Sequence, residues 1–368
     1  MPELPSRPRN VAVLRANAVG DFVFALPALE ALRARFPEAE LVLLGKPWHR
    51  DFLRGRPGPV DRVIALPKIA GVGEHETYPT DQAELEACLA ELRGERFDLA
   101  VQIHGGGQYS NPFVDAMSPG FSIGLRAPGA APLDRWVRYV YWQPEILRML
   151  EAAALAGATP TTLTPRLAVR AADRAEASAA IRSGRLVAIH PGAGDVRRRW
   201  PPEHFREVAR ALAGAGFDVA VVGGAGEDER IAEQITAGLG VPVRNLAGRL
   251  SLGGLVGLLA SARLLVANDS GPLHLAEAVG TPTVGIYWCG NLVNADPMTR
   301  DSHRPVLSWR VNCPECGANV LTGRCDHPRS FADLAPVGEV LAHCFDLLDR
   351  PSPAAAAEPT AGGVAAGP

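Results

Sequence analysis

The sequence predicts an α/β protein made of two domains, each with a doubly wound parallel sheet. A chain of 368 residues exceeds what one hydrophobic core usually organises. Short apolar runs typical of buried strands alternate with helical segments up to residue 103, and the alternation restarts at residue 186. Because this alternation is typical of parallel sheets covered on both faces, each half is expected to form one.

The first half is expected to open with a strand, a turn at Gly20 and Asp21, and a helix over Leu26–Phe36, where leucines recur at helical spacing. A second helix is expected over Gln82–Arg93. The expected strands are Val11–Arg15, Leu41–Gly45, Val60–Leu66 and Leu99–Ile103.

Residues 118–165 are rich in Gly and Pro and are expected to form a rim that leads into a linker. This region carries an aromatic run, Trp136–Trp142, and then a helical pattern over Pro144–Ala156. We place the domain boundary within residues 159–168. The predicted domains are therefore residues 1–165 and residues 166–350.

The second half repeats the strand and helix alternation. The tail, residues 351–368, consists mainly of Ala, Pro and Gly, cannot bury enough apolar surface to order itself, and is predicted to be disordered. The expected strands are Leu186–His190, Asp218–Val222 and Leu264–Ala267, and the expected helices are Glu203–Gly214, Asp228–Leu239 and Ser251–Ala260.

Composition excludes several classes of function. Hydrophobic residues make up 47% of the chain and its net charge is −3, so the basic excess of nucleic-acid-binding proteins is missing. The first ten residues lack the apolar core of a signal peptide, and no apolar run approaches the roughly 18 residues that span a bilayer. We therefore expect a cytoplasmic protein without a transmembrane segment and without a nucleic-acid partner.

The most informative motif is Asn268-Asp269-Ser270-Gly271-Pro272-Leu273-His274, where an apolar strand ends and a helix begins. Open α/β sheets bind ligands at such junctions. The amides of Ser270 and Gly271 can hold an anion at the helix N-terminus, with Asp269 and His274 beside them. This motif predicts a phosphate-bearing ligand.

A glycine and arginine loop follows the strand that ends at His190. Gly192, Ala193 and Gly194 would let a diphosphate approach the backbone, and Arg197–Arg199 could pair with its oxygens. The glycines alone would fit a solvated loop. Three arginines directly before a helix favour a bound anion, because their charge opposes the helix dipole.

An acidic turn, Glu227 to Glu229, follows Gly223 and Gly224 at the end of the next strand. One of these carboxylates could accept the hydroxyls of a ribose, whereas simple helix capping is an equally good reading for each residue. Neither a Gly-x-Gly-x-x-Gly fingerprint after a strand nor an Asp-x-Asp motif is present. A leaving diphosphate would then be stabilised by helix amides and arginines instead of a divalent metal.

The first domain offers a candidate base and acceptor-side residues. Asn17 and Asp21 follow the first strand, so the Asp21 carboxylate could face the cleft and deprotonate an acceptor hydroxyl; a helix cap is the alternative. His104 and Gly105 begin another glycine-rich loop, where a substrate could approach the backbone closely. A merely flexible loop is equally compatible.

Cys313 and Cys316 form a Cys-x-x-Cys pair, and Cys325 and His327 follow it closely. This compact spacing is typical of a tetrahedral zinc site that pins an irregular loop. Four protein ligands leave no open position, so such a zinc would be structural. Free cysteines or a loop disulfide are the alternatives.

The motifs together, in this order, resemble glycosyltransferase family 9, the ADP-heptose:lipopolysaccharide heptosyltransferases and their relatives. The likeness spans most of residues 10–290. The matching segments are Arg15 to Asp21 with Leu26 to Leu29, His190 to Ala193 with Arg199 to Pro201, Val222 to Gly224 with Glu227 to Glu229, and Asn268 to Ala276.

The resemblance implies a GT-B fold, in which two Rossmann-like doubly wound domains face a central cleft. Residues 1–165 would then be the acceptor domain, and residues 166–350 the nucleotide-sugar donor domain. It also implies inverting, metal-independent transfer of a sugar, a heptose from an ADP-sugar, to a hydroxyl of lipopolysaccharide or another glycan. A glycan or lipid-linked acceptor would bring the protein to a membrane surface peripherally.

The resemblance also assigns residues. Asp21 would be the general base, and Arg199, where the family usually has a lysine, would neutralise the departing diphosphate. The remaining donor-binding residues would be Gly192, Ala193, Arg198, Glu227, Glu229, Leu250, Asp269, Ser270, Gly271 and His274, with Glu227 or Glu229 on the ribose and Leu250 near the adenine.

Two alternatives to a transferase remain open from the sequence. A GT-B-like sugar-nucleotide epimerase would need no acceptor. A non-catalytic nucleotide-sugar-binding protein would keep the donor pocket and lack transfer.

Overall fold

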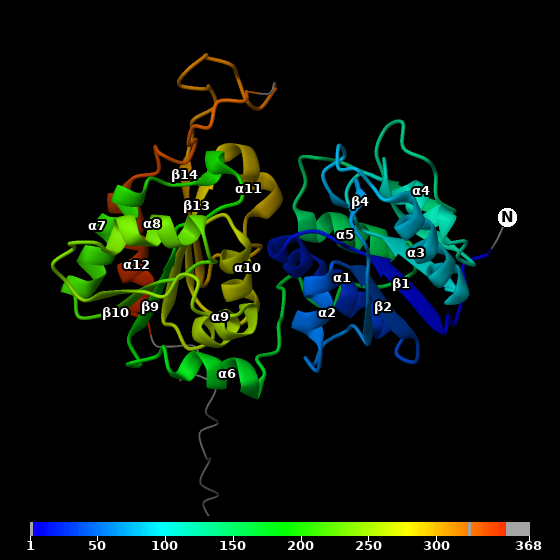
Figure 1. The fold of residues 1–368 in the computed structure, drawn as a ribbon, viewed down its shortest axis with the longest axis horizontal. Helices are drawn as coiled ribbons and strands as arrows, with labels where there is room; N and C mark the ends of the chain where they lie inside the picture. The colour runs from blue at the N-terminus through cyan, green and yellow to red at the C-terminus, as the bar shows by residue number, and fades with distance from the viewer. Residues whose placement is uncertain (1–2, 323–324, 351–368) are drawn as a thin grey trace, which may run out of the picture.

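The computed structural model describes residues 3–322 and 325–350 and contains two Rossmann-like domains with the GT-B arrangement (Figure 1). Each domain has a six-stranded parallel sheet, ordered β3-β2-β1-β6-β7-β8 in the first and β11-β10-β9-β12-β13-β14 in the second. When the strands of each sheet are numbered one to six along the chain, leaving out the short β4-β5 pair, both sheets have the spatial order 3-2-1-4-5-6. This is the strand order of dinucleotide-binding folds, so the predicted fold class is confirmed.

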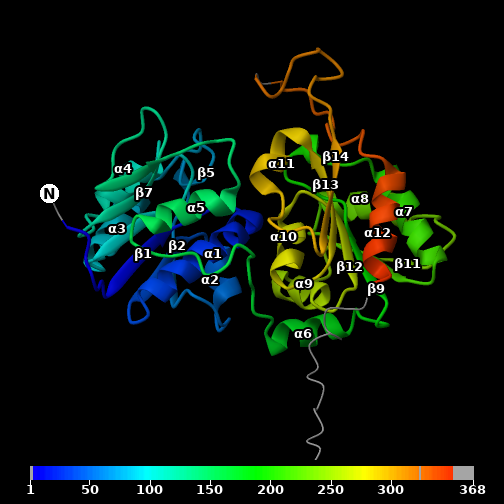
Figure 2. The same cartoon turned by 180° about the vertical axis from the view of Figure 1, so that it is seen from behind.

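Helices cover both faces of the first sheet (Figures 1 and 2). Its elements are β1 (Asn10–Leu14), α1 (Val19–Arg35), β2 (Glu40–Gly45), α2 (Pro47–Leu53), β3 (Arg62–Ala65), β4 (Ile69–Ala70), β5 (Gly73–Glu74), α3 (Gln82–Gly94), β6 (Leu99–Gln102), α4 (Ser110–Ala116), β7 (Ser122–Arg126), β8 (Arg135–Arg138) and α5 (Glu145–Ala154).

The second domain repeats this organisation and adds α6 before its first strand. Its elements are α6 (Ala171–Ser178), β9 (Leu186–His190), the short 3₁₀ helix η1 (Val196–Arg198), α7 (Pro202–Gly214), β10 (Asp218–Val221), α8 (Glu227–Thr236), β11 (Val243–Asn245), α9 (Leu252–Leu259), β12 (Leu264–Asn268), α10 (Gly271–Ala278), β13 (Thr283–Trp288), α11 (Cys289–Ala295), β14 (His303–Ser308) and α12 (Val337–Leu348).

The largest apolar core runs from one domain into the other. It contains residues of α1 and α5 from the first domain and of α9 and α10 from the second. Separate clusters fill the other face of each sheet. Since α1 packs on both α5 and α10, the two domains meet through the helices that follow β1 and β12.

The predicted helix over Leu26–Phe36 begins too late, because α1 starts at Val19 and includes Gly20 and Asp21, which we had read as a turn. Pro27 lies inside this helix. The first half of α1 is buried on nearly all sides, against its own sheet and against the other domain. A helix buried all round shows no polar face, so helical periodicity could not reveal its beginning.

The rim predicted over residues 118–165 contains two strands that the sequence did not reveal, β7 and β8. They extend the first sheet beyond β6 and match the fifth and sixth strands of the second sheet. The exposure of β8 explains why that strand was missed, since three of its four residues are exposed and its pattern is not that of a buried strand.

The chain crosses between the sheets in the segment from α5 to α6. Across this crossing Arg56 and Asp173 form an ion pair in which both side chains are 1% exposed. Arg56 also donates to the carbonyl of Ala168 at 2.6 Å. The boundary between residues 165 and 166 stays a prediction, and the tail at 351–368 lies outside the described residues.

None of the helices in the described part of the chain is both long and apolar enough to cross a bilayer.

Candidate active site

The candidate site lies where the strand order reverses in each sheet. In the first sheet this point falls between β1 and β6, and in the second between β9 and β12. Loops on the two sides of such a point diverge and leave a crevice at the carboxyl ends of the strands. The predicted motifs at Asp21, at Arg197–Arg199 and at Asp269–His274 all follow these strands directly.

The N-termini of α1 and α10 meet across the two domains. A Cβ atom on Gly20 would lie 3.0 Å from Cδ2 of His274, and one on Gly271 would lie 3.1 Å from Cβ of Val19. Glycine at both positions therefore permits the close approach. The first-turn amides of each helix have no acceptor within their own helix, so two positive helix ends converge on one point. This arrangement suits an anion.

A cavity of about 560 Å³ lies beside this meeting point. Its volume is in the range of small-ligand pockets. One wall is apolar and formed by leucines, including Leu250, whereas Arg199, Ser270 and the α1 N-terminus form its polar end. We call it the donor cavity. Its lining residues are Ala18 to Gly20, His190, Ala193, Gly194, Arg199, Val222 to Gly224, Asp228, Leu246, Leu250 to Leu252, Leu255 and Ser270 to Pro272.

A second cavity of about 310 Å³, here the central cavity, joins the donor cavity through shared lining residues. Both are lined by Gly20, Ser270 and Gly271. The first domain contributes the carboxylates of Asp21 and Glu145 to the central cavity, and the second contributes that of Asp269. Its other lining residues are Ala18, Phe24, Tyr141, Gly194, Arg198, His274, Asn291, Asn294 and Ala295.

Asp21 makes a helix-capping contact and also lines the central cavity. Its Oδ2 accepts the backbone N–H of Ala18 at 3.2 Å, which is a helix-capping contact. Its Oδ1 lies 3.1 Å from Nη2 of buried Arg15, and the side chain is 38% exposed. A carboxylate held in place by these two contacts keeps lone pairs that a hydroxyl in the central cavity can reach.

His274 lies between two carboxylates. Its Nε2 is 3.0 Å from Oδ1 of Asp269, and its Nδ1 is 3.3 Å from Oε2 of Glu277. Burial alone would lower the pKa of His274, but Glu277 and Asp269 outweigh it and raise the pKa to about 10. The imidazole therefore carries a positive charge at neutral pH.

Asp269 is the centre of this charged cluster and is 1% exposed. Burial would raise its pKa, but His274 and Arg198 lower the pKa below its usual range. Arg198 lies 3.1 Å from Oδ2, and the side-chain amide of Asn291 donates to the same oxygen. With these partners Asp269 stays negatively charged, and its carboxylate holds the side chains of His274, Arg198 and Asn291 in place.

The three consecutive arginines have different partners. Arg199 pairs with Glu227 at 3.1 Å and donates from Nε to the carbonyl of Ala193 at 2.8 Å. Arg197 pairs with Asp195 at 2.6 Å. Only Arg199 of the three lines the donor cavity, whereas Arg198 lines the central cavity.

Of the acidic turn, Asp228 lines the donor cavity, and Glu227 and Glu229 do not. Asp228 accepts the N–H of Gly224 at 2.8 Å. A Cβ atom on Gly192 would lie 2.1 Å from its Oδ1, so Gly192 leaves the space that this carboxylate fills. Glu227 pairs with arginines, and Glu229 accepts the N–H of Gly226, which is the helix-capping role.

The acceptor-side residues that we predicted, Asn17, His104 and Gly105, do not line the donor or central cavity of the described chain. His104 is buried, and Nδ1 accepts the N–H of Ala16 at 3.1 Å. Burial and the charge of Arg15 lower the pKa of His104 to about 3, so the ring is neutral. These contacts give His104 a role in holding the loop after β1.

Several lining residues were missed by sequence reasoning. Tyr141 and Glu145 belong to the rim segment and the start of α5, and Asn291 and Asn294 belong to α11. Asn294 donates to the carbonyls of Tyr141 and Gln143, which ties the second domain to the rim. The aromatic run Trp136–Trp142 was the one sequence signal near this edge.

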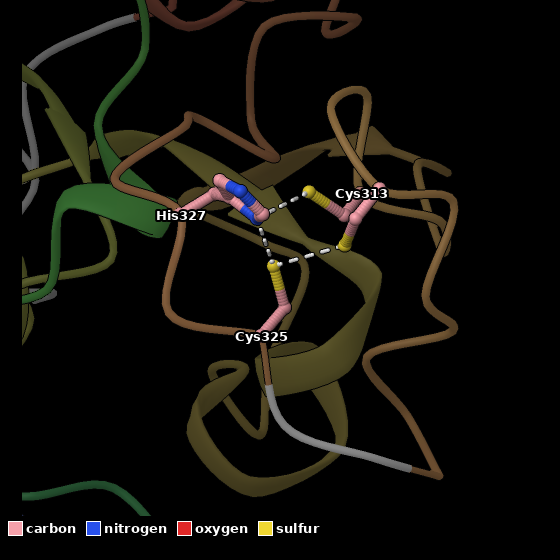
Figure 3. Close-up of side chains that lie close together, drawn as sticks. Cys313, Cys325 and His327 are labelled. Atoms are coloured by element: carbon pink, nitrogen blue, oxygen red, sulfur yellow. Dashed lines mark hydrogen bonds between the residues drawn. The ribbon is translucent and has the colours of Figure 1, made fainter.

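The predicted cysteine and histidine cluster assembles in the segment between β14 and α12 (Figure 3). The ligand atoms of Cys313, Cys316, Cys325 and His327 lie within 4.8 Å of one another. Sγ of Cys316 is 3.6 Å from Sγ of Cys325, and Sγ of Cys313 is 3.8 Å from Nδ1 of His327. A tetrahedral zinc with bonds of about 2.3 Å places sulfur ligands about 3.8 Å apart, so the set fits one ion.

The alternative of a loop disulfide is not what the described cysteines form. All six are free in the structure. A disulfide needs sulfur atoms about 2.05 Å apart, much closer than the Cys316–Cys325 pair. The spacing therefore favours metal coordination over a disulfide.

Comparison with known proteins agrees with these features. Residues 87–316 match the family described as glycosyltransferase family 9 (heptosyltransferase). Lipopolysaccharide heptosyltransferase 2 of Escherichia coli K12 is 28% identical over 301 residues, which are 76% of this chain and 82% of that protein.

Solved structures are similar over nearly the whole length. The glycosyl transferase family 9 protein of Veillonella parvula has a TM-score of 0.73 at 17% identity, covering 93% of this chain and 98% of that chain. The E. coli ADP-heptose lps heptosyltransferase II has a TM-score of 0.70 at 21% identity, covering 92% and 98%. At these identities the structural likeness establishes the fold.

Proposed function

Because the chain belongs to glycosyltransferase family 9 and is therefore a glycosyltransferase, we propose that it transfers a heptose from an ADP-sugar to a hydroxyl of a lipopolysaccharide or similar glycan. The observation that supports this most is the adjacency of the two cavities. The donor cavity, with two helix N-termini at its polar end, shares Gly20, Ser270 and Gly271 with the central cavity that Asp21 lines. A donor and an acceptor can therefore meet at one carboxylate.

The proposed donor position follows from the lining of the donor cavity. The diphosphate lies at the N-termini of α1 and α10, where Arg199 adds a positive charge. The adenine packs on the apolar wall formed by Leu246, Leu250 and Leu255. Asp228, instead of Glu227 or Glu229, accepts the ribose hydroxyls, because it is the acidic side chain inside this cavity.

The proposed reaction is a single inverting displacement. Asp21 takes the proton of the acceptor hydroxyl as its oxygen attacks the anomeric carbon, and the bond from that carbon to the diphosphate oxygen breaks. The nucleoside diphosphate leaves with the electron pair. Arg199 and the two helix ends stabilise the negative charge that develops on it, without a metal ion in the chemistry.

The cysteine and histidine cluster holds a structural zinc in this proposal. Three thiolates and one imidazole are a ligand set that zinc favours, and they leave no open coordination position for substrate. A cytoplasmic location and peripheral membrane contact through a lipid-linked acceptor belong to the same proposal.

The test replaces Asp21 with Asn, which keeps an oxygen to accept the Ala18 N–H and removes the base. Asp21→Asn is expected to lower turnover about 10²- to 10⁴-fold, while the Kd for ADP-heptose measured by calorimetry changes less than about twofold. Asp51→Asn, at an exposed aspartate of α2, is the matched control and keeps full turnover. Retained turnover in Asp21→Asn would refute the assigned base.

The same assay separates the alternatives. An epimerase would convert the donor into an isomer without any acceptor, which chromatography of the nucleotide sugar detects. A non-catalytic binding protein would bind ADP-heptose and show no transfer to deacylated lipopolysaccharide cores. Transfer that depends on both substrates supports the proposal.

A further inference from the structure

A third cavity, here the outer cavity, continues the cleft away from the donor cavity. It measures about 610 Å³ and shares Tyr141, Arg198 and Asn291 with the central cavity. Its remaining lining residues are Trp142, Asp195, Arg197, Trp288, Gly290 and Val320 to Thr322. The three cavities are thus adjacent, each sharing lining residues with the next, and Asp21 lines the middle one.

One wall of the outer cavity belongs to the segment that carries the cysteine and histidine cluster. Val320, Leu321 and Thr322 lie between Cys316 and Cys325 in the chain. This segment, residues 309–336, projects from the end of β14 (orange in Figure 1). Its described residues form no helix or strand and have one isolated β-bridge, between Asn312 and Asn319. Its shape therefore depends on other contacts.

Those contacts tie the ends of the segment to the second domain and join neighbouring parts of the segment to each other. Cys313 packs with Trp288 and Phe331 in a small buried group. The N–H of Phe331 donates to the carbonyl of Arg197 at 2.7 Å, and Nε1 of Trp288 donates to the carbonyl of Arg310 at 2.7 Å. These contacts hold the two ends of the segment, and backbone hydrogen bonds from Val320 to Val311 and from Cys313 to Ala318 join part of its described middle to the end that follows β14. The cluster adds a connection between Cys316 and Cys325, which stand on either side of Leu321 and Thr322 in the chain. A metal ion bound by the four ligands would fix the positions of Cys316 and Cys325 and so restrain the wall residues between them.

We infer that a metal bound by Cys313, Cys316, Cys325 and His327 shapes one wall of the acceptor site, and that the outer cavity binds the glycan of the acceptor next to its reacting hydroxyl. The inference rests on the proposed function, since it names the position and the chemistry of that function's acceptor.

The lining of the outer cavity fits sugar rings. Tyr141 and Trp142 are 58% and 49% exposed, and their rings offer apolar faces on which the C–H face of a sugar packs. Arg197 and Asn291 supply hydrogen-bond donors for hydroxyl or acidic substituents. An aromatic platform beside fixed polar groups is suited to a glycan, and the nucleotide is already accounted for in the donor cavity.

The metal is tested by elemental analysis and by removal. Full-length protein purified without chelator is expected to contain about one zinc per chain, and Cys316→Ser with Cys325→Ser is expected to contain none. In that double variant the KM for deacylated lipopolysaccharide core rises at least about tenfold, whereas the Kd for ADP-heptose changes less than about twofold. Metal-free wild-type protein, or an acceptor KM unchanged by the double substitution, would overturn the inference.

A second variant leaves the metal ligands intact. Leu321→Ala shortens an exposed side chain of the outer wall, so the acceptor KM rises about threefold to tenfold with kcat unchanged and zinc content retained. Leu334→Ala removes a similarly exposed leucine of the same segment that does not line the cavity, and it is the matched control. Equal acceptor KM values in the two variants would contradict the inference.

If the proposed function itself is wrong, these experiments give a different pattern of donor binding and zinc content. Wild-type protein that does not bind ADP-heptose would refute the donor assignment, while the zinc content still reports on the metal. If the donor binds and transfer occurs, the zinc content of the wild-type protein and the acceptor KM of the variants decide the inference. Hydrogen exchange in residues 141–142 and 320–322 provides a readout without turnover: both segments gain protection when the deacylated core is added.

Discussion

The buried cluster of Asp269, His274 and Glu277 makes a prediction about stability and pH. His274 has a pKa of about 10 in the folded protein, whereas an unperturbed histidine, as in the unfolded chain, has a pKa of 6.5. Between these two pH values the folded state therefore keeps a proton that the unfolded state has lost. The stability that this proton contributes is fully present below pH 6.5 and is lost as the pH rises towards 10. The free energy of unfolding therefore decreases as the pH rises.

The size of this effect follows from one proton. Where the folded state holds one more proton than the unfolded state, the free energy of unfolding falls by at most about 1.4 kcal/mol per pH unit. From pH 7 to pH 9 this amounts to at most about 3 kcal/mol. Asp269 does not interfere in this window, since its pKa is lowered and its contribution is lost only at acidic pH.

The reference is the double variant His274→Gln with Glu277→Gln, which removes the titrating imidazole without leaving Glu277 as an unpaired buried carboxylate. Urea unfolding is followed by tryptophan fluorescence at pH 7, 8 and 9 in both proteins. The wild-type advantage in unfolding free energy is expected to shrink as the pH rises. A constant difference, or one that disappears already near pH 6.5, would show that His274 is neutral and refute the reasoning.

Further predictions concern the donor cavity and the domain crossing. Arg199→Ala removes a cation from the polar end of the donor cavity and is expected to lower kcat/KM about 10²-fold or more by steady-state kinetics, with partial recovery in Arg199→Lys. Gly20→Ala places a Cβ atom 3.0 Å from the His274 ring and is expected to weaken ADP-heptose binding in calorimetry, with Gly58→Ala, in open space, as the control. Asp173→Ala leaves Arg56 buried without its carboxylate and is expected to cost about 3–5 kcal/mol of unfolding free energy; an unchanged melting temperature would contradict this expectation.

Local patterns predicted β1, β9 and β12 because each is a short continuous apolar run, whereas β7 and β8 were missed. The burial of β1, β9 and β12 is nearly complete, as the apolar runs indicated. The start of α1 was missed for the opposite reason: its apolar residues face the sheet on one side and α10 on the other, so no polar face marks a helix.

Individual site residues divide in the same way. The cysteine and histidine cluster was predictable because its four ligands lie within one short segment, and their spacing is itself the signal. The sequence could not predict which of Glu227, Asp228 and Glu229 enters the donor cavity, because neighbouring residues of one helix turn point in different directions. Only the packing of Asp228 against Gly192 and Gly223 decides which carboxylate enters the donor cavity.

The sequence by itself determined the two-domain α/β class, the family resemblance and the motifs that end each strand, because these depend on local composition and on order along the chain. The tertiary structure alone decided what those motifs face. Tyr141 and Thr322 are far apart in the chain and line one cavity, and Gly20 and Gly271 bring two helix N-termini together. Such contacts arise from the packing of one domain on the other, which no local pattern encodes.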